Sequence, residues 1–343
     1  MRIAVVGTED WRRLAVNEPL PCPFQPIKVH VEKGAKIVRI TPWMGWCHGV
    51  RVLGGDWVPV TQDGLALLEQ MVHSPSIFLP KSRHLHGTAD GIALASLPER
   101  VLSEDVVLVG GSPNYYHWLV DNLPRLLMAR GFAGHAKLLV PDNLLEFQRR
   151  TLELLGYSAQ HLIPVSADEC VVPNRMLVPS LLATSTFPHP DVVKLLRKYL
   201  LSVQHPPKAS RRIFISRADA KSRRLLNEDE LMPVLERHGF ERVVIGQMSF
   251  DEQIRLYAEV DVLLAVHGAG ITNMVFMPPK SKVLEIGCRQ HPATFFSHLA
   301  LVSGRSHQVL HGDAVMGAMD DNALAADWVL HPDVLTKALA QLG

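Results

Sequence analysis

VDVLLAVHGAGITNMVF, residues 260–276, is the stretch from which the fold of this chain can be inferred. Its first half is a run of aliphatic and β-branched residues, typical of a strand that is buried on both faces in a parallel sheet. Gly268 and Gly270 then permit a tight turn and a close approach of a ligand to the backbone, and residues 271–276 have a helical pattern. We therefore predict a central strand that leads into a helix N-terminus at the carboxyl edge of its sheet.

Such a turn suits a phosphate group, because the first N–H groups of a helix are unpaired and lie at the positive end of its dipole. The glycines alone fit an ordinary strand-to-helix turn equally well. The polar neighbours favour a ligand, since His267 can donate to a phosphate or a sugar hydroxyl, and Asn273 can bind the ligand or cap the next helix.

The composition indicates a two-domain globular protein without a strong net charge. The 343 residues, 47% of them hydrophobic, are enough for two cores of ordinary size. Lysine and arginine number 35, and aspartate and glutamate number 34. No global field therefore attracts nucleic acid, and an anionic ligand needs a local cluster of positive charge.

The cysteine pattern and the lack of long apolar segments predict a cytoplasmic location. Cys22, Cys47, Cys170 and Cys288 form no Cys-x-x-Cys pair, which argues against a structural zinc site and a disulfide scaffold. The apolar run at the N-terminus is too short for a signal peptide, and no run reaches the roughly eighteen residues of a transmembrane helix. Peripheral contact with the inner face of a membrane stays open.

We predict an α/β fold with a domain boundary between residues 204 and 205. Residues 101–204 and 205–343 both alternate strand-like and helix-like segments, as α/β domains with parallel sheets do, and HPPK at the start of the second range is typical of a linker. Residues 1–100 are rich in proline, glycine and tryptophan, so we expect an irregular β-containing segment packed on the first domain. Its tryptophans could stack on sugar rings, but packing is the favoured interpretation; they are Trp11, Trp43, Trp46 and Trp57.

His117, Asp121 and Arg125 follow a predicted strand at residues 106–109 and are spaced by four, which places them on one face of a helix. Pro124 removes a backbone donor in the middle of this helix, so we expect a kink near Asp121. The histidine and the carboxylate can act as a base and its orienting group. A surface salt bridge between Asp121 and Arg125 explains the spacing equally well.

A second group of charged residues follows the predicted strand at residues 212–216. Arg217 comes directly after it, with Lys221, Arg223 and Arg224 close behind. A guanidinium can hold two phosphate oxygens at once, which suits a diphosphate, but most charge runs of this kind are solvated turns. The sequence has no Asp-x-Asp pair and no Gly-x-x-x-x-Gly-Lys-Ser/Thr loop, so cationic side chains and a helix N-terminus would replace a bound metal.

The motifs in these regions, taken in order, resemble those of glycosyltransferase family 61. They are HWxxDxLPR at residues 117–125, ISR at 215–217, RLLNE at 224–228, SFxxQI at 249–254 and HGAGITN at 267–273 with Phe276. Bacterial members of this family are often tied to capsular or other surface polysaccharides. The resemblance implies a GT-B fold, in which two Rossmann-like domains face a cleft, and an inverting transfer from a nucleotide-activated sugar without an essential metal.

On this basis we expect a glycosyltransferase that moves a sugar from a nucleotide diphosphate sugar, by hypothesis a uridine diphosphate (UDP) sugar, to a hydroxyl of a glycan or glycolipid acceptor. Asp121 would be the general base and His117 would position the acceptor, with the two roles open to exchange. Glu285 would accept hydrogen bonds from the ribose, and the nucleotide base would lie near residues 246–249. The expected donor-binding residues are Arg217, Lys221, Arg224, His267, Gly268, Ala269, Gly270, Asn273 and Glu285.

Two other classes of function stay open. A sugar-nucleotide epimerase or hydrolase could use the same architecture, and it would convert or release the sugar without an acceptor. A non-catalytic nucleotide-binding or glycan-binding protein would bind the donor without any turnover.

Overall fold

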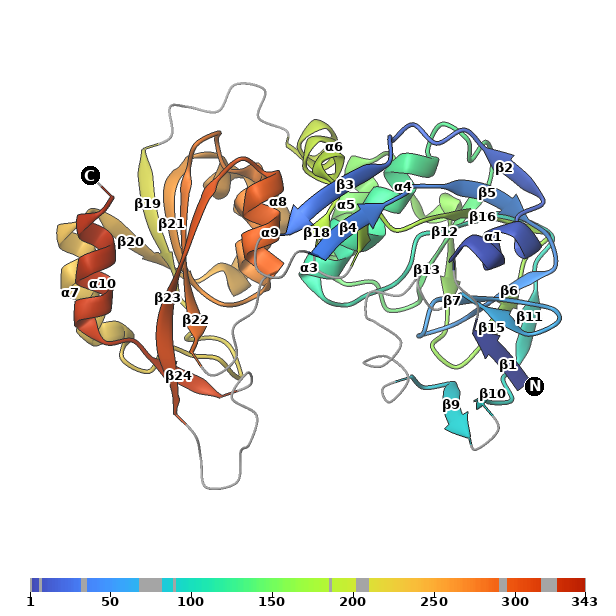
Figure 1. The fold of residues 1–343 in the computed structure, drawn as a ribbon, viewed down its shortest axis with the longest axis horizontal. Coiled ribbons are helices and arrows are strands. Elements are labelled where there is room, and N and C mark those ends of the chain that lie inside the picture. The colour runs from blue at the N-terminus through green and yellow to red at the C-terminus, as the bar shows by residue number, and fades with distance from the viewer. Residues whose placement is uncertain are drawn as a thin grey trace. The chain divides into compact units, whose positions relative to one another are not determined.

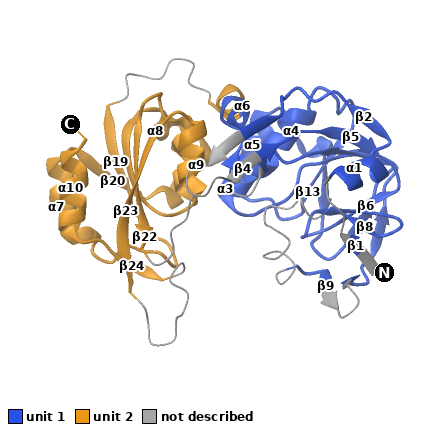
Figure 2. Cartoon of the chain, in the orientation of Figure 1, with its two compact units in different colours: residues 1–195 blue, residues 196–343 orange. Residues whose placement is uncertain are grey.

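The structure is a computed structural model that describes residues 2–5, 8–31, 36–67, 82–88, 91–184, 187–201, 210–289, 295–315 and 326–342. It divides into two compact units, residues 1–195 (unit 1) and residues 196–343 (unit 2), which Figure 2 colours separately. This division precedes the predicted boundary, and the predicted linker at residues 205–208 lies outside the described residues. Within the described ranges, no helix is long and apolar enough to cross a membrane.

The described part of unit 2 is built on a six-stranded sheet that is parallel except at its last pair, β23 and β24. From edge to edge its strands are β20 (Phe240–Val243), β19 (Arg211–Ile215), β21 (Val260–Val266), β22 (Lys282–Cys288), β23 (Ser306–Val315) and β24 (Asp327–Val329). The helices are α7 (Glu228–Arg237), α8 (Phe250–Ala258), α9 (Phe295–Val302) and α10 (Pro332–Ala340), with the 3₁₀ turns η5 (Ile245–Gln247) and η6 (Ala269–Phe276). In Figure 1, α7 and α10 lie on one side of this sheet and α8 and α9 on the other.

The stretch at residues 260–276 takes the predicted place in this sheet. β21 lies between β19 and β22 and is almost entirely buried, so the predicted central strand is confirmed. The predicted helix after it is the tighter 3₁₀-helix η6, which begins directly after Gly268. Numbered along the chain, the strand order is 2-1-3-4-5-6, so the direction of winding reverses between β19 and β21. In open parallel sheets, the crevice at the carboxyl ends of strands at such a point is the usual ligand site.

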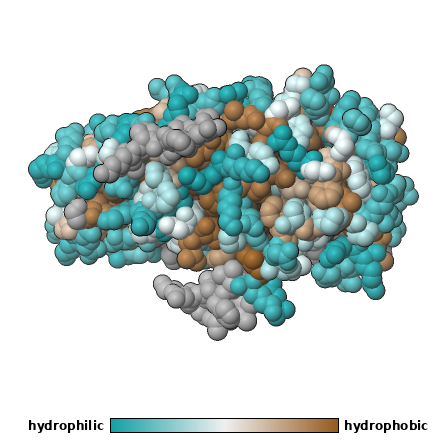
Figure 3. All heavy atoms as spheres, turned by 90° about the horizontal axis from the view of Figure 1, so that it is seen from above, coloured by the Kyte–Doolittle hydropathy of each residue, from teal (hydrophilic) through white to brown (hydrophobic). Residues whose placement is uncertain are grey.

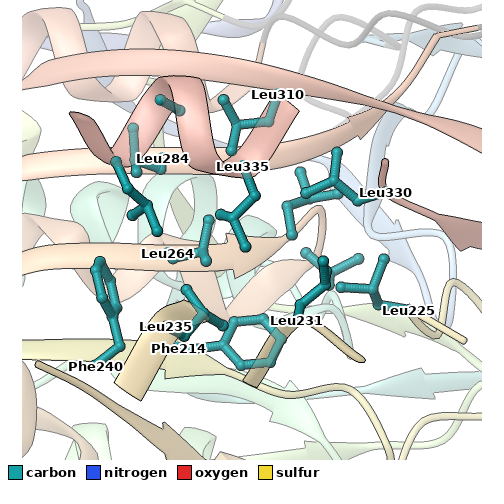
Figure 4. Packing of buried hydrophobic residues seen from close by; sticks show 14 of the residues in the cluster. Phe214, Leu225, Leu231, Leu235, Phe240, Leu264, Leu284, Leu310, Leu330 and Leu335 are labelled. Atoms are coloured by element: carbon teal, nitrogen blue, oxygen red, sulfur yellow. The ribbon is translucent and has the colours of Figure 1, made fainter. Parts of the chain in front are cut away.

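The core of unit 2 fixes β21 at the centre of the sheet (Figure 4). Leu235 of α7 and Leu335 of α10 belong to the same buried cluster as Leu264 of β21 and Leu284 of β22. Each fully buried leucine contributes about 1.5–3 kcal/mol through the hydrophobic effect, so the apolar run of β21 is most stable between two other strands and beneath helices. The face of the molecule seen in Figure 3 is more mixed, with hydrophilic residues over much of it and hydrophobic residues among them.

The described part of unit 1 contains a six-stranded sheet. Its order is β14 (Leu162–Val165), β13 (Lys137–Pro141), β12 (Asp105–Leu108), β16 (Arg175–Pro179), β5 (Met44–Cys47) and β2 (Glu18–Leu20). The first four strands are parallel and follow the order 3-2-1-4, so the winding reverses between β12 and β16. Helix α5 (Glu146–Leu154) connects β13 to β14. The mixed α/β class predicted from the sequence is confirmed.

Residues before position 100 supply strands to both large sheets of unit 1, since β5 pairs with β16 in the first sheet and Val50–Leu53 pairs with Cys170–Val172 in the second. The second sheet runs β11 (Glu99–Val101), β15 (Cys170–Val172), β6 (Val50–Leu53), β7 (Val58–Thr61), β8 (Leu65–Ala66), β1 (Arg2–Val5), β10 (Gly91–Leu94) and β9 (Leu85–Thr88). The other described elements are α1 (Thr8–Ala15), the pairs β3 (Ile27–Val31) with β4 (Lys36–Ile40) and β17 (Ala183–Thr184) with β18 (Phe187–Pro188), η4 (Ala159–His161) and α6 (Pro190–Leu200).

The tryptophans of this N-terminal region pack in the interior. The four side chains are at most 8% exposed, and three of them belong to one hydrophobic cluster with residues of β12 and β16. The packing interpretation is therefore confirmed. They are Trp11, Trp43, Trp46 and Trp57.

The helix predicted after β12 is interrupted near Asp121, as the sequence indicates. It starts as α3 (Tyr115–His117), where the side chain of Asn114 accepts a hydrogen bond from the backbone N–H of His117. A π-helical turn, η3 (Trp118–Asn122), separates it from α4 (Leu123–Ala129). Pro124 lies in the first turn of α4, where its missing N–H costs least, so the disruption falls on the turn before it. Such π turns occur frequently at functional sites.

Candidate functional site

An open pocket of about 240 Å³ lies at the carboxyl ends of β19 and β21, where the winding of the unit 2 sheet reverses. The loop after β19, the 3₁₀ turn η5 and the glycine turn after β21 form its walls. The polar or glycine residues among them are Ser216, Arg217, Asp219, Gly246, Gly268 and Gly270.

Arg217 is held against the glycine turn by its own loop. Its Nε donates to the carbonyl oxygen of Arg223 at 3.1 Å, and its Nη2 donates to the carbonyl oxygen of Ser222 at 3.1 Å. A Cβ atom at Gly268 would lie 2.3 Å from Nη1, so a larger residue there would displace the guanidinium from this position. Nη1 has no hydrogen-bond partner among the described residues. Burial and the charge of Arg223 lower the pKa of Arg217, and a bound anion would offset both effects.

A buried carboxylate fixes the start of this loop. Glu228 is 6% exposed and accepts hydrogen bonds from Ser216 Oγ at 2.6 Å and from the backbone N–H of Arg217 at 3.3 Å. Ser216 Oγ also accepts from the N–H of Ala218 at 3.1 Å. The ISR and RLLNE motifs therefore meet, and their contact sets the point from which the Arg217 side chain extends.

The glycine turn leaves backbone donors for a ligand. The Gly268 carbonyl accepts from the N–H of Ile271 at 3.0 Å, and the Tyr257 hydroxyl donates to the Gly270 carbonyl at 2.9 Å. The N–H groups of Ala269 and Gly270 are the first of η6 and have no partner among the described residues. Together with Arg217 Nη1 they form a group of N–H donors suited to an anion.

Asn273 lies outside this pocket, which corrects the expected ligand contact. Its side chain is fully buried, and its Nδ2 donates to Gln253 Oε1 at 3.0 Å. The Nε2 of Gln253 donates in turn to the carbonyl oxygens of Ile245 at 3.3 Å and Met248 at 3.0 Å. Asn273 therefore supports η5, a wall of the pocket, and has no access to a ligand.

Glu285 lies between two histidines, a different set of partners from the expected ribose. It is 2% exposed, and its Oε1 contacts His267 Nδ1 while its Oε2 lies 2.7 Å from His307 Nε2. Burial raises the pKa of Glu285, but the hydrogen bonds from both histidines outweigh this effect, so that its pKa is lowered. The His267 ring packs against Phe296, with ring centroids 5.2 Å apart. Both carboxylate oxygens of Glu285 accept hydrogen bonds from histidines of the same unit, so we no longer assign Glu285 to the ribose.

The basic residues of the loop after β19 have different environments. Arg224 is paired with Asp327 of β24, with Nε at 2.9 Å and Nη2 at 2.5 Å from the same carboxylate oxygen. The half-buried side chain of Arg223 has no hydrogen-bond partner among the described residues, and burial lowers its pKa. Lys221 is exposed. Arg223 is therefore better placed than Arg224 to meet an anion, although the sequence alone does not separate the two.

In unit 1, His117 and Asp121 form a hydrogen-bonded pair after the carboxyl end of β12. His117 Nδ1 lies 2.7 Å from Asp121 Oδ2 across the π-helical turn, so the predicted pairing on one face is confirmed. The side chains are 14% and 9% exposed. An ionised carboxylate only accepts hydrogen bonds, which assigns the ring proton to Nδ1 and leaves Nε2 as the proton acceptor of a neutral ring.

Arg125 is a buried cation near this pair, which contradicts the alternative interpretation of the spacing as a surface salt bridge between Asp121 and Arg125. Arg125 is 1% exposed, and its Nε donates to the Pro179 carbonyl oxygen at the end of β16 at 3.0 Å. Its Nη2 is buried without a hydrogen-bond partner. Burial lowers the pKa of Arg125 to about 9, and the charge of Asp121 opposes this shift. The guanidinium therefore hydrogen-bonds the end of β16, one of the two strands between which the winding of this sheet reverses.

The structure thus gathers Arg217, Gly268 and Gly270 at one pocket in unit 2 and places His117 with Asp121 in unit 1. Sequence reasoning missed Asp219, which lies in the pocket wall between the ISR and RLLNE motifs. It also missed the histidine partner of Glu285 in β23 and the support that Gln253 gives to η5, although Gln253 belongs to the SFxxQI motif.

Comparisons with known proteins agree with these motifs. Residues 115–284 match the family described as Glycosyltransferase 61. The chain is 30% identical over 203 residues to an alpha-1,3-arabinosyltransferase of Oryza sativa subsp. japonica, a match that covers 52% of this chain and 35% of the relative. A beta-1,2-xylosyltransferase of the same species is 27% identical over 199 residues, which cover 50% of this chain and 42% of the relative.

An animal relative matches over a shorter stretch. The EGF domain-specific O-linked N-acetylglucosamine transferase of Drosophila melanogaster is 33% identical over 84 residues, which cover 24% of this chain and 16% of that protein. In each of these comparisons the matched segment spans less than half of the relative's own length.

Proposed function

We propose, from the match of residues 115–284 to the Glycosyltransferase 61 family, that the chain transfers a sugar from a nucleotide diphosphate sugar to an acceptor hydroxyl. The named relatives transfer arabinose, xylose or N-acetylglucosamine, which supports a sugar donor and a glycan or protein acceptor in general. We propose UDP as the nucleotide and a surface glycan or glycolipid as the acceptor.

The observation that carries the proposal is the group of unpaired N–H donors on Arg217 and the glycine turn, which line or adjoin the unit 2 pocket. Arg217 Nη1 and the N–H groups of Ala269 and Gly270 would hold the diphosphate and stabilise the negative charge that grows on it as it leaves. Arg223 would add a second guanidinium, with Lys221 at the rim. In this proposal the arginine and lysine side chains neutralise the diphosphate, which is the role that a divalent metal would otherwise have.

Asp219 takes over the role that we first gave to Glu285. It lies in the pocket wall, and its Oδ2 is so close to the backbone of Gly246 that a Cβ atom there would lie 2.0 Å away. A carboxylate at the carboxyl end of a strand can accept hydrogen bonds from ribose hydroxyls, as acidic residues do in other nucleotide-binding sheets. The nucleotide base would then lie along η5.

We propose His117 as the general base and Asp121 as the group that orients it, within the pair of roles that the sequence left open. The buried carboxylate already accepts from Nδ1, whereas Nε2 can take the proton of the acceptor hydroxyl during a single inverting displacement at the anomeric carbon. A GT-B arrangement, in which unit 1 binds the acceptor and unit 2 the donor, is part of this proposal.

A thermal-shift series tests the nucleotide site directly. UDP and UDP-sugars at about 100 times their Kd should stabilise the fold by about 2.7 kcal/mol, because they bind the native state alone. Uridine, which lacks the diphosphate, should have little effect at the same concentration. Failure of every nucleoside diphosphate to raise Tm would count against the proposal. Sugar release from the donor without an acceptor would instead favour a hydrolase.

Arg223 and Arg224 form a matched pair for a second test. Arg223→Gly removes a guanidinium at a residue whose φ is 57°, so the backbone should accept glycine without loss of stability. We expect UDP affinity to fall about tenfold, the effect of one charged hydrogen bond, when it is measured by calorimetry. Arg224→Ala breaks only the exposed pair with Asp327 and should leave affinity within about twofold. An equal loss of UDP affinity in Arg223→Gly and Arg224→Ala would mean that Arg223 makes no specific contact with the ligand.

A further inference from the structure

His267 is the last member of a chain of hydrogen bonds that begins in α9. Ser297 Oγ lies 3.3 Å from His307 Nδ1, His307 Nε2 lies 2.7 Å from Glu285 Oε2, and Glu285 Oε1 contacts His267 Nδ1. The side chains of His267, Glu285 and His307 are 10%, 2% and 7% exposed. Nε2 of His267 has no hydrogen-bond partner among the described residues. It belongs to the residue that directly precedes Gly268, at the same edge as the pocket.

The carboxylate sets the direction of every bond in this chain. An ionised carboxylate can only accept, so His267 must donate through Nδ1 and His307 through Nε2. The lowered pKa of Glu285 agrees with an ionised group. Nδ1 of His307 is then free to accept from the hydroxyl of Ser297. A neutral imidazole that donates through Nδ1 carries a lone pair on Nε2.

We propose that Glu285 and His307 are positioning residues that hold His267 as its Nδ1–H tautomer, so that Nε2 accepts a hydrogen bond from a hydroxyl of the bound sugar nucleotide. This inference rests on the proposed function and replaces the expectation that His267 donates to a phosphate or a sugar hydroxyl. Phosphate oxygens are themselves acceptors, so a lone pair on Nε2 cannot bind them. The hydroxyl belongs either to the ribose or to the transferred sugar, and binding measurements separate the two.

The tautomer can be measured without any ligand. Nitrogen-15 NMR at pH 8, with the signals of His267 assigned from their loss in His267→Phe, should show the proton on Nδ1 in the wild type. Glu285→Leu removes the acceptor, so the His267 signals should shift toward the Nε2–H form. A wild-type spectrum with the proton on Nε2 overturns the proposal even if the leucine variant does not fold.

Binding separates a hydroxyl contact from a phosphate contact. We expect His267→Phe to weaken UDP-sugar binding roughly two- to tenfold, the effect of one hydrogen bond, and to leave inorganic pyrophosphate binding unchanged. A loss already present with UDP assigns the hydroxyl to the ribose, and a loss that appears only with the UDP-sugar assigns it to the transferred sugar. His331→Asn, at an exposed histidine of the same unit, should change neither affinity.

An equal loss for pyrophosphate, UDP and the UDP-sugar in His267→Phe would mean that His267 contacts phosphate, and would overturn the inference. No loss for any of the three would overturn it as well. If the wild type binds none of these ligands, the proposed function fails, whereas the NMR result still decides the tautomer.

Discussion

Asp121→Asn is expected to lower turnover by about 100- to 10,000-fold, the usual contribution of general-base catalysis, while UDP affinity stays within about twofold of wild type. The asparagine amide can donate as well as accept, so it no longer keeps the proton of His117 on Nδ1. Nε2 would then lose the lone pair that accepts the proton of the attacking hydroxyl. The measurement is kcat with saturating donor, with calorimetry of UDP binding beside it.

His117→Phe should show a loss of similar size, because the carboxylate and the imidazole act as one unit. Asp168→Asn is the matched control, since that carboxylate is 71% exposed and only 3.7 Å from Arg83 in a surface ion pair. Normal turnover in Asp121→Asn would exclude the pair from the chemistry. A normal rate in His117→Phe with a large loss in Asp121→Asn would return the role of base to the carboxylate.

Arg217→Ala should weaken UDP binding by about 10- to 100-fold, which corresponds to the roughly 1.5–3 kcal/mol of hydrogen bonds to a charged group. The guanidinium is the group whose Nη1 faces the glycine turn without a hydrogen-bond partner among the described residues. Arg217→Lys keeps the charge but cannot donate to both loop carbonyls in the same planar geometry, so we expect only partial recovery. Titration calorimetry with UDP measures the affinity of both variants.

Loss of the two bonds to the Ser222 and Arg223 carbonyls also loosens the loop after β19, so some loss of stability is expected in Arg217→Ala. Binding should therefore be compared at a temperature well below the lower Tm. Arg211→Ala removes a guanidinium at the amino end of β19 that pairs with Glu241 and Glu259, and it serves as the control within unit 2. If Arg217→Ala binds UDP as tightly as Arg211→Ala does, the assignment of the pocket to the diphosphate is wrong.

Much of the secondary structure, including where strands and helices begin and are interrupted, could be predicted from the sequence. The apolar run of β21 predicted a central buried strand, and the spacing of His117 and Asp121 predicted their contact. Pro124 predicted the interruption near Asp121, although nothing in the sequence specified a π-helical turn. The helix after β21 was predicted, but its 3₁₀ form depends on tertiary contacts of the turn, such as the Tyr257 hydroxyl on the Gly270 carbonyl.

The sequence by itself determined where strands, turns and shared helix faces lie, because burial demands apolar runs and a fixed residue spacing decides which side chains meet within one element. Only the tertiary structure decided which polar groups are used inside the fold and which face the pocket. The Glu285 carboxylate accepts a hydrogen bond from His307 of the next strand, and the Asp327 carboxylate accepts one from Arg224, which lies far from it along the chain. The sequence offers several possible donors for each carboxylate. The packing of strands and loops decides which donor comes within hydrogen-bonding distance.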